Sequence, residues 1–478
     1  MADASVRATR LSASSISMAG PEPQTARSIA AKVLCEAQRS RQFAGEILEK
    51  YPQMTERQRA TDLVFGVIRN HSAIDLVIEK VSSRLVERIA GKILNVIRVG
   101  VYELIYCPQT AEHAIVDEAV EYVKHVTNTR QADFVNAVLR QTQRHINNRR
   151  ISLEEAHPQK TIPQTPNTGC EFDIDILPAD ESTQKYLSIA FSLPDWLVAG
   201  WLAEYGEKQT RAICFASNRR PGVYLRPNPL KTTAAELAEK LRTSDVECEI
   251  EPESQMIKLT SPKAITALPG FDEGLFAVQD LAASQPVRLL QPPSGWTILD
   301  LCAAPGTKTT QLAEATGGLA KIIATDIDAG RLKMVRENVA RLGLAACVTV
   351  IDYHAVDDCA KRLGGFDCVL IDAPCSNTGV LARRPEVRHR ITQKTIEDLT
   401  KVQSDLLSQA GKILKPQGII CYSTCSIQQD ENNLLVGRFL AENTSYRIKL
   451  EKLTLPSAEG FDHDGGYAAI ITNQADAT

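Results

Sequence analysis

The sequence predicts an α/β protein in which an all-α region and a small α+β module precede a doubly wound parallel sheet. Three observations support this prediction. From about Leu275 onward, short apolar runs alternate with stretches of helical periodicity, as expected for strands and their crossover helices. Residues 27–150 carry apolar side chains at helical spacing. Residues 186–270 mix shorter strand-like and helix-like patterns, which is typical of an α+β module.

Composition limits the kinds of protein that the chain can be. It has 478 residues, of which 44% are hydrophobic, enough for two or more globular domains. The formal net charge is -4, so any nucleic-acid surface must be a local basic patch. No apolar run approaches the ~18 residues that a membrane-spanning helix requires. The twelve cysteines are scattered and form no cluster with zinc spacing, which favours a reducing cytoplasm and no bound metal.

The first 26 residues are rich in Ser, Ala and Arg and lack the apolar segment of a secretory signal. We interpret them as a disordered tail, because they offer little apolar surface to bury. An organellar transit peptide is the alternative, since such peptides are also rich in Arg and poor in acidic residues.

Residues 27–150 are predicted to be helical. Leu63, Val64, Val67 and Ile68 recur at helical spacing, and so do Ile93, Leu94, Ile97 and Val101. Lys and Arg modestly outnumber Asp and Glu here, which fits a solvated helical face as well as an RNA-binding surface. Residues 151–185 contain several prolines and little periodicity, so we expect a linker.

The remaining chain divides into the module at 186–270 and the sheet domain at 271–478. In the module, the pattern predicts helices at Asp195–Tyr205 and Thr232–Arg242 and strands at Gly222–Arg226, Val246–Ile250 and Met256–Leu259. In the sheet domain, it predicts parallel strands at Ile298–Leu301, Lys321–Thr325, Cys347–Ile351, Phe366–Ile371 and Gly418–Tyr422. Together with the tail at 1–26, the helical region at 27–150 and the linker at 151–185, this makes five segments.

A loop of small residues follows the first of these strands and is typical of a nucleotide-binding turn. It comprises Cys302, Ala303, Ala304, Pro305, Gly306, Thr307 and Lys308. Small side chains let the backbone approach a ligand, and the next helix can point its N-terminal amides there. An ordinary tight turn is the alternative.

Two acidic residues close the second and third strands of the predicted sheet. Asp326 stands where a carboxylate binds ribose hydroxyls in such sheets. Asp352 is placed to accept a hydrogen bond from an adenine amino group. A strand-terminal Asp can also serve only as the cap of the following helix or turn.

Two cysteines lie just beyond the ends of predicted strands. Cys375 follows Phe366–Ile371 in the sequence Asp-Ala-Pro-Cys-Ser, and Cys425 follows Gly418–Tyr422 in Ser-Thr-Cys-Ser. Open α/β sheets build their active sites at this edge. Two thiols beside a nucleotide-type cofactor suggest covalent chemistry at an electrophilic carbon. A cytosine of RNA or DNA is the natural candidate.

These motifs together resemble the S-adenosylmethionine-dependent RNA cytosine-5 methyltransferases, and most closely the Sun or RsmB-like branch that acts on bacterial small-subunit ribosomal RNA. The resemblance covers roughly residues 27–470. His113–Val120 and Phe134–Arg140 look like the NusB-like RNA-binding domain of that branch. Arg226–Asn228 and Phe276–Asp280 are similar to its segments before the catalytic domain. The resemblance implies a Rossmann-like sheet, S-adenosylmethionine as cofactor and 16S ribosomal RNA as partner; we also expect a cytoplasmic monomer.

The resemblance also implies that Cys425, Cys375, Asp372 and Lys308 are catalytic. Cys425 is the expected nucleophile at C6 of cytosine, and Cys375 assists release of the methylated base. Asp372 would hydrogen-bond N3 and N4 of the base, with Lys308 in the same region. The basic run Arg383–Arg390 is expected to hold RNA phosphates and to favour a thiolate. Two alternatives stay open: the same chemistry on transfer RNA or another RNA, and a non-catalytic RNA-binding assembly factor.

Overall fold

The computed structural model describes residues 25–40, 42–51, 56–179, 182–261 and 263–474. The expected N-terminal tail lies almost wholly outside the described residues. Contacts divide the chain into two compact units. The first comprises residues up to Val67 with Ile74–Arg149 and Phe172–Ile174, and the second comprises Ile68–Ala73, Arg150–Glu171 and the chain from Asp175 onward.

The N-terminal region is helical, as its apolar periodicity predicts. Its elements are α1 (Ala26–Ser40), α2 (Ala44–Leu48), α3 (Arg57–Arg69), α4 (His71–Ser82), the 3₁₀ turn η1 (Val86–Arg88), α5 (Gly91–Tyr106), α6 (Glu112–Val126) and α7 (Thr129–His145). Residues whose spacing predicts the helices, such as Val64 and Ile97, are fully buried. The side chain of Asn128 starts α7 by accepting a hydrogen bond from Gln131 N.

Residues 151–185 are more ordered than the linker that we expected. A three-stranded sheet in the order β1-β3-β2 is formed by β1 (Ile146–Ser152), β2 (Thr161–Pro163) and β3 (Thr168–Phe172). Ile162, Cys170 and Phe172 are fully buried. Because the strands are short and β2 ends at a proline, no alternation runs long enough to reveal them in the sequence.

A four-stranded antiparallel sheet forms the centre of the α+β module. The elements are α8 (Thr183–Ala190), α9 (Asp195–Asn218), β4 (Val223–Pro227), α10 (Ala234–Arg242), β5 (Cys248–Ile250), β6 (Ile257–Leu259), η2 (Ile265–Ala267) and β7 (Phe276–Val278), with strand order β5-β6-β4-β7. The helix α9 is interrupted at Gly206, where φ is +74°, so its first part ends where the sequence predicts. The strand β7 extends the module beyond the boundary expected at residue 270.

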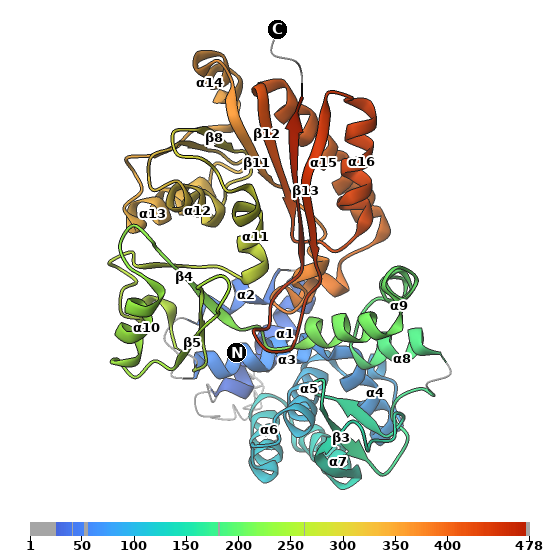
Figure 1. Ribbon diagram of the computed structural model, residues 1–478. Helices are drawn as coiled ribbons and strands as arrows, with labels where there is room; N and C mark the ends of the chain where they lie inside the picture. Colours follow the sequence, from blue (N-terminus) through green and yellow to red (C-terminus); the bar gives the residue numbers. More distant parts are fainter. Residues whose placement is uncertain (1–24, 41, 52–55, 180–181, 262, 475–478) are drawn as a thin grey trace, which may run out of the picture. The chain divides into compact units, whose positions relative to one another are not determined.

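A seven-stranded sheet in the order β10-β9-β8-β11-β12-β14-β13 forms the rest of the second unit (Figure 1). Its strands are β8 (Thr297–Asp300), β9 (Lys321–Ala324), β10 (Val348–Val350), β11 (Phe366–Asp372), β12 (Leu414–Thr424), β13 (Tyr446–Thr454) and β14 (Gly466–Asn473). The five predicted strands, β8 to β12, are all present and parallel. The sheet is nevertheless mixed, because β14 pairs antiparallel with both β12 and β13.

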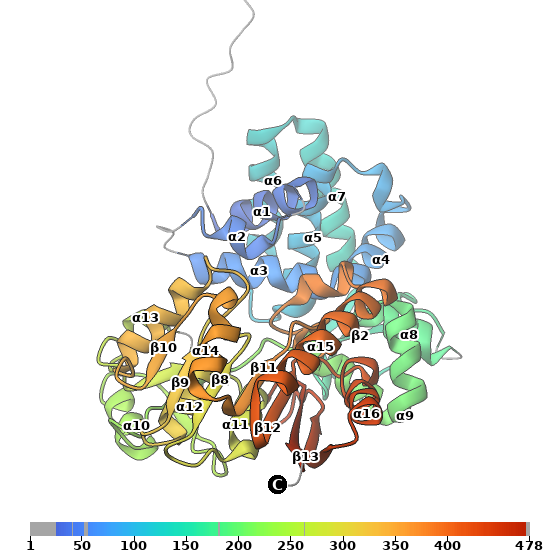
Figure 2. The same cartoon turned by 90° about the horizontal axis from the view of Figure 1, so that it is seen from above.

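Helices cover both faces of this sheet, as the alternating pattern predicts (Figures 1 and 2). One face packs against α14 (Val356–Leu363), α15 (Gln393–Ile413) and α16 (Asn433–Glu442), and the other against α11 (Leu281–Leu290), α12 (Thr307–Ala315) and α13 (Leu332–Leu342). Short 3₁₀ turns at Tyr353–Ala355 (η3), Thr378–Val380 (η4), Pro385–His389 (η5) and Gln429–Glu431 (η6) occupy the connections. Within the described residues, no helix is both long and apolar enough to cross a membrane.

Candidate active site

The two cysteines that the sequence places at strand ends lie side by side. The strands β11 and β12 pair in parallel with Asp372 opposite Ser423, so the loops that follow them leave the same edge of the sheet. Ala373 N donates to Ser423 O at 2.8 Å and joins the two loops at their start. The Sγ atoms of Cys375 and Cys425 are 3.2 Å apart. Both thiols can therefore act on the same bound substrate.

The surroundings of the two thiols differ, and the difference favours a proton on Cys375. A hydrogen bond with Cys425, burial, and the negative charges of Cys425 and Glu431 raise the pKa of Cys375 well above its usual value. Cys425 is only partly buried, and its thiol donates to Asn377 Oδ1 at 3.3 Å. Cys375 is therefore the member of the pair that keeps its proton, and Cys425 is the one more exposed to a substrate in the cavity.

A buried ion pair lies beside the thiols. Lys308 Nζ is 2.7 Å from Asp372 Oδ2. Burial lowers the pKa of Lys308, but the charges of Asp372, Cys425 and Asp300 more than offset this, and the net pKa is raised. Ser423 Oγ donates to Asp372 Oδ1 at 3.1 Å and holds the carboxylate in place. Lys308 therefore stays charged, and its fixed positive charge lies close enough to interact with Cys425.

The loop of small residues forms a tight turn between β8 and α12. Gly306 has φ +99°, and a Cβ added there would meet Val335 Cα at 3.2 Å. Only glycine fits this position without strain. Ala304 N donates to Asp326 Oδ2 at 3.1 Å, so the turn is tied to the end of β9. The turn thus brings its backbone and the Asp326 carboxylate together, as the sequence predicts for a nucleotide-binding edge.

A cavity of about 480 Å³ connects this loop with the two thiols. From the residues predicted to form the site, its lining includes Cys302, Ala304, Pro305, Asp326, Asp372, Cys375 and Cys425. Residues that sequence reasoning did not identify also line it, among them Tyr353, Asn377, Asp405 and Gln409. These come from η3, from the Cys375 loop and from α15, and no motif in the sequence marks them.

The predicted residues Ala303, Gly306, Thr307 and Lys308 lie next to the cavity but are not part of its lining. Asp352 is also outside the lining, and it is exposed. Its side chain accepts a hydrogen bond from His354 N at 2.9 Å and caps η3, which is the alternative role considered for it. The neighbouring Tyr353 reaches the cavity instead.

Asp300 is a buried carboxyl group within the predicted strand Ile298–Leu301, and no feature of the sequence marks it as a site residue. Its side chain is fully buried, and Thr309 Oγ1 donates to Oδ2 at 2.6 Å. Within the described residues, Oδ1 has no hydrogen-bond partner. Burial raises the pKa of Asp300 to about 7, against an ordinary value of 3.8. The group is therefore protonated in much of the folded protein at neutral pH.

We expect Asp300→Asn to remove part of the pH dependence of stability. Between pH 4 and pH 7 an unfolded chain loses the Asp300 proton while the folded chain retains it, so the free energy of unfolding falls as pH rises through this window and then levels off. The fall attributable to Asp300 is roughly 2–4 kcal/mol. Urea titrations of both proteins at several pH values measure it. Parallel stability curves for wild type and variant would contradict the assignment.

The basic run Arg383–Arg390 is mostly structural, which corrects the expectation that it holds RNA phosphates. Arg383 forms ion pairs with Asp280 at 2.8 Å and Asp464 at 2.5 Å. Arg388 is 2% exposed and donates hydrogen bonds to backbone carbonyls and to Asn218 Oδ1. Arg390 lies 3.5 Å from Glu386. The contacts of Arg383 and Arg388 stabilise the loop after Cys375, so these two guanidinium groups are occupied within the protein, whereas Arg390 is exposed.

Arg384 is the exception in this run. It is exposed, it lines the 480 Å³ cavity beside both thiols, and its guanidinium has no ion pair or hydrogen bond within the described residues. A cation at the mouth of the cavity is suited to an anionic substrate. Of the basic residues in the run, Arg384 is the one that lines the candidate cavity.

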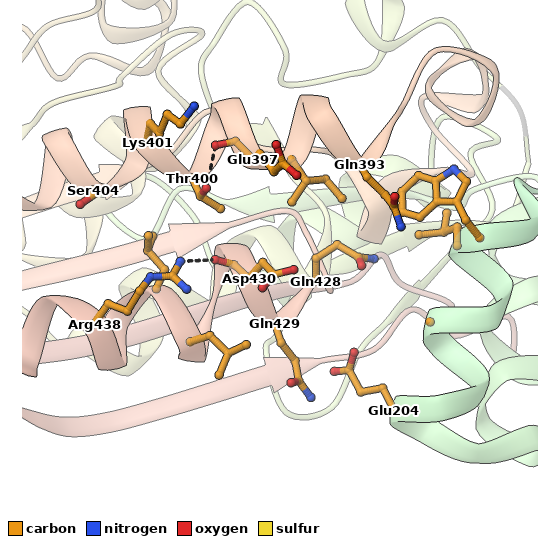
Figure 3. Close-up of a pocket in the computed structure, with 16 residues that line it drawn as sticks. Glu204, Gln393, Glu397, Thr400, Lys401, Ser404, Gln428, Gln429, Asp430 and Arg438 are labelled. Atoms are coloured by element: carbon orange, nitrogen blue, oxygen red, sulfur yellow. Dashed lines mark hydrogen bonds between the residues drawn. The ribbon is translucent and has the colours of Figure 1, made fainter.

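A second, larger cavity of about 1000 Å³ lies beside α15 and η6 (Figure 3). Its labelled side chains include the acidic Glu204, Glu397 and Asp430 and the basic Lys401 and Arg438. Neither thiol, nor any residue of the small-residue loop, lines it. The first cavity, which joins that loop to both thiols, is therefore the candidate active site.

Family comparisons agree with this division of the chain. The model of the family described as 16S rRNA methyltransferase RsmB/F matches residues 287–474. The NusB family matches residues 24–144, and the RsmF/B-like ferredoxin-like domain matches residues 193–266. The three matches fall on the sheet domain, the helical region and the α+β module, respectively.

Similar proteins extend over nearly the whole chain. Ribosomal RNA small subunit methyltransferase B of Yersinia pseudotuberculosis serotype O:1b is 33% identical over 456 residues, which is 93% of this chain and 98% of that protein. The protein of the same description from Photorhabdus laumondii is 32% identical over 462 residues, covering 94% and 98%. The expected resemblance is confirmed by these matches.

Solved structures share the fold. The crystal structure of PH0851 has a TM-score of 0.68 at 22% identity, over 94% of this chain and 99% of that one. A methyltransferase homologue from Pyrococcus horikoshii has a TM-score of 0.51 at 25% identity, over 61% and 99%. NSun6 from the same organism, crystallised with SFG, has a TM-score of 0.53 at 20% identity, over 59% and 99%. The predicted fold class is confirmed.

Proposed function

The chain belongs to the RsmB/F family of 16S rRNA methyltransferases, and from this membership we propose that it methylates C5 of a cytosine in small-subunit ribosomal RNA, with S-adenosylmethionine as the methyl donor. The observation that carries the proposal is the pair of thiols, 3.2 Å apart at one end of the candidate cavity. A second thiol at this distance from the first fits a covalent mechanism in which one thiol attacks the base and the other assists release.

The residues of the cavity fit the proposed cofactor. Gly306 lets the backbone of the turn come close to a ligand, and the turn leads into the N-terminus of α12. Each oxygen of the Asp326 carboxylate accepts one backbone hydrogen bond, from Ala304 N and Asp328 N, which leaves lone pairs for ribose hydroxyls. When bound, S-adenosylmethionine supplies an electrophilic methyl group on a sulfonium.

The proposed chemistry begins at Cys425. C5 of cytosine is too weak a nucleophile to accept a methyl group unaided, and attack of the Cys425 thiolate at C6 makes C5 enamine-like. Asp372 is placed to hydrogen-bond N3 and N4, which stabilises the ring as C6 is attacked. Lys308 keeps Asp372 in position and stabilises the thiolate. After methylation a water molecule accepts the C5 proton, the electron pair of the C5–H bond re-forms the C5–C6 double bond, and the bond between C6 and the Cys425 sulfur breaks. Cys375, which retains its proton, donates that proton to the departing Cys425 sulfur.

The N-terminal helical region is a NusB domain, and relatives of this chain act on ribosomal RNA. We infer that it binds 16S ribosomal RNA and that the enzyme works in the cytoplasm as a monomer. The experiment that tests the function compares 5-methylcytosine positions in RNA from cells with and without the gene. Loss of one site in 16S ribosomal RNA is expected. Loss of a site in transfer RNA would support that alternative, and an unchanged map would support the non-catalytic assembly factor.

We expect Asp326→Ala to weaken S-adenosylmethionine binding by roughly 1–3 kcal/mol, because ribose hydroxyls would lose a buried hydrogen-bond partner. Titration calorimetry of the purified, folded variant measures the change. Asp328→Ala is the matched control, since its carboxylate is exposed and, among the residues that the structure describes, accepts hydrogen bonds from Gly330 N and Arg331 N. Equal affinities of Asp326→Ala and wild type for S-adenosylmethionine would show that Asp326 does not bind the cofactor.

A further inference from the structure

We propose that Glu431 is a positioning residue that holds the two cysteine loops in register for the methyl transfer. Glu431 lies in η6, six residues after Cys425, and its side chain is fully buried. It touches neither thiol through a hydrogen bond, so its action on the reaction is indirect. The inference rests on the proposed two-thiol mechanism and adds to it the group that fixes the separation of the thiols.

The carboxylate of Glu431 binds the residue that follows each cysteine. Oε1 accepts a hydrogen bond from Ser376 N at 2.8 Å. Oε2 accepts from Ser426 Oγ at 2.5 Å and from Ser376 Oγ. Ser376 follows Cys375 and Ser426 follows Cys425, so one rigid group bridges both loops next to the reacting atoms.

Further buried polar groups complete this bridge. Ser426 Oγ lies 3.0 Å from both Ser376 Oγ and Thr378 Oγ1. On the other side, Asn432 Nδ2 donates to Ser426 O at 3.0 Å, and Thr424 Oγ1 donates to Asn432 Oδ1 at 2.6 Å. The side chains of this network are at most 4% exposed. A buried polar network in which each member has partners specifies one geometry, because any shift leaves a buried group unpaired.

Helix α15 is tied to the same carboxylate. Gln403 Nε2 donates to Glu431 Oε1 at 3.1 Å and to Pro374 O at 2.9 Å, directly before Cys375. Tyr422 Oη donates to Glu431 O at 2.7 Å and fixes the backbone of η6 to β12. The Tyr422 hydrogen bond therefore fixes the backbone of Glu431, and its carboxylate in turn fixes the two cysteine loops.

The three residues before Glu431 lie at the larger cavity and not between the cysteine loops. Gln428, Gln429 and Asp430 line the larger cavity, where Arg438 donates to Asp430 O at 3.2 Å (Figure 3). Glu431 is not part of that lining. A charged side chain buried between two loops costs desolvation energy unless each oxygen is paired, and here the pairing is achieved by groups of the cysteine loops. The negative charge also helps to keep the proton on Cys375.

The test compares Glu431→Gln and Glu431→Ala with wild type in single-turnover methylation of RNA, at a temperature well below unfolding. We expect Glu431→Ala to lower the rate by about 100-fold with S-adenosylmethionine and RNA affinities unchanged, because the loops lose their register but the binding surfaces do not. Glu431→Gln should retain most of the rate, since its amide can bind the same serines when their hydroxyls rotate. Asp430→Asn, an exposed neighbour, is the matched control and should behave as wild type.

A second readout follows the covalent step directly. In a Cys375→Ala background, the rate at which RNA becomes crosslinked to protein should fall by a similar factor when Glu431→Ala is added. Equal rates for Glu431→Ala and wild type, or a loss confined to RNA or cofactor affinity, would overturn the positioning role. If the wild-type protein itself methylates no cytosine, the proposed function fails, and this outcome is distinct from failure of the Glu431 inference.

Discussion

Cys425→Ser is expected to abolish methylation, by more than about 10³-fold, without forming a covalent adduct with RNA. A serine hydroxyl at this position stays protonated and is a much weaker nucleophile than a thiolate. The positive charge of Lys308 nearby is not enough to ionise a hydroxyl to a useful extent. The variant is therefore expected to bind cofactor and RNA and to stop before the first bond forms.

Cys375→Ala is expected to give the opposite result. The C6 adduct should form, because Cys425 is intact, but should not break down, because the thiol 3.2 Å away that assists release is missing. Protein bound to RNA would then accumulate and survive a denaturing gel. Cys421→Ala is the control, since this thiol is fully buried within β12. An adduct from Cys425→Ser and none from Cys375→Ala would reverse the two roles.

The strands that build this site could be predicted because they are buried on both faces. In β8, β9, β11 and the second half of β12 most residues are apolar and buried, and such runs are readily detected. The strand β13 was not predicted, because it lies at the edge of the sheet and most of its side chains are exposed. Its charged residues, Arg447, Lys449, Glu451 and Lys452, resemble those of a surface loop, and pairing with β14 makes it a strand.

The strand pattern also predicted where the candidate site lies, but it did not predict the contacts among the buried side chains of the site. Cys375 and Cys425 stand just beyond strand ends, and parallel pairing brings such positions together. Asp300 and Glu431 gave no such signal, because a carboxyl group inside an apolar strand or a polar turn looks like many others. Burial and partners distinguish them, and both depend on which distant segments the fold brings into contact.

The basic run Arg383–Arg390 is a second case in which contacts between distant segments could not be predicted from the sequence. Several Arg and His residues near a thiol are typical of a phosphate-binding surface. Sequence cannot show that acceptors from distant segments converge on them: Arg388 Nη1 donates to Arg69 O at 2.8 Å and to Phe191 O at 3.0 Å, which are 319 and 197 residues away. The guanidinium is used to satisfy backbone carbonyls that would otherwise be buried without partners.

This arrangement leads to the second large expected effect: Arg388→Ala should lower the free energy of unfolding by roughly 3–5 kcal/mol. The guanidinium also binds Ser217 O and Asn218 Oδ1, at 2.7 and 2.6 Å, so its loss leaves several buried acceptors unpaired and opens a cavity. Burial lowers the pKa of Arg388 to about 9, and the group therefore remains charged at neutral pH. Urea denaturation of the full chain measures the change.

Arg384→Ala, four residues earlier, is the matched comparison, because it removes the same side chain from an exposed position at the mouth of the cavity. Its stability should stay within about 0.5 kcal/mol of wild type. Its RNA affinity should fall, with a shallower dependence on salt, because one phosphate contact is lost. If Arg384→Ala instead destabilises the fold while Arg388→Ala weakens only RNA binding, the division of the basic run into structural and RNA-binding residues is wrong, and the run is the phosphate-binding surface that its composition first indicated.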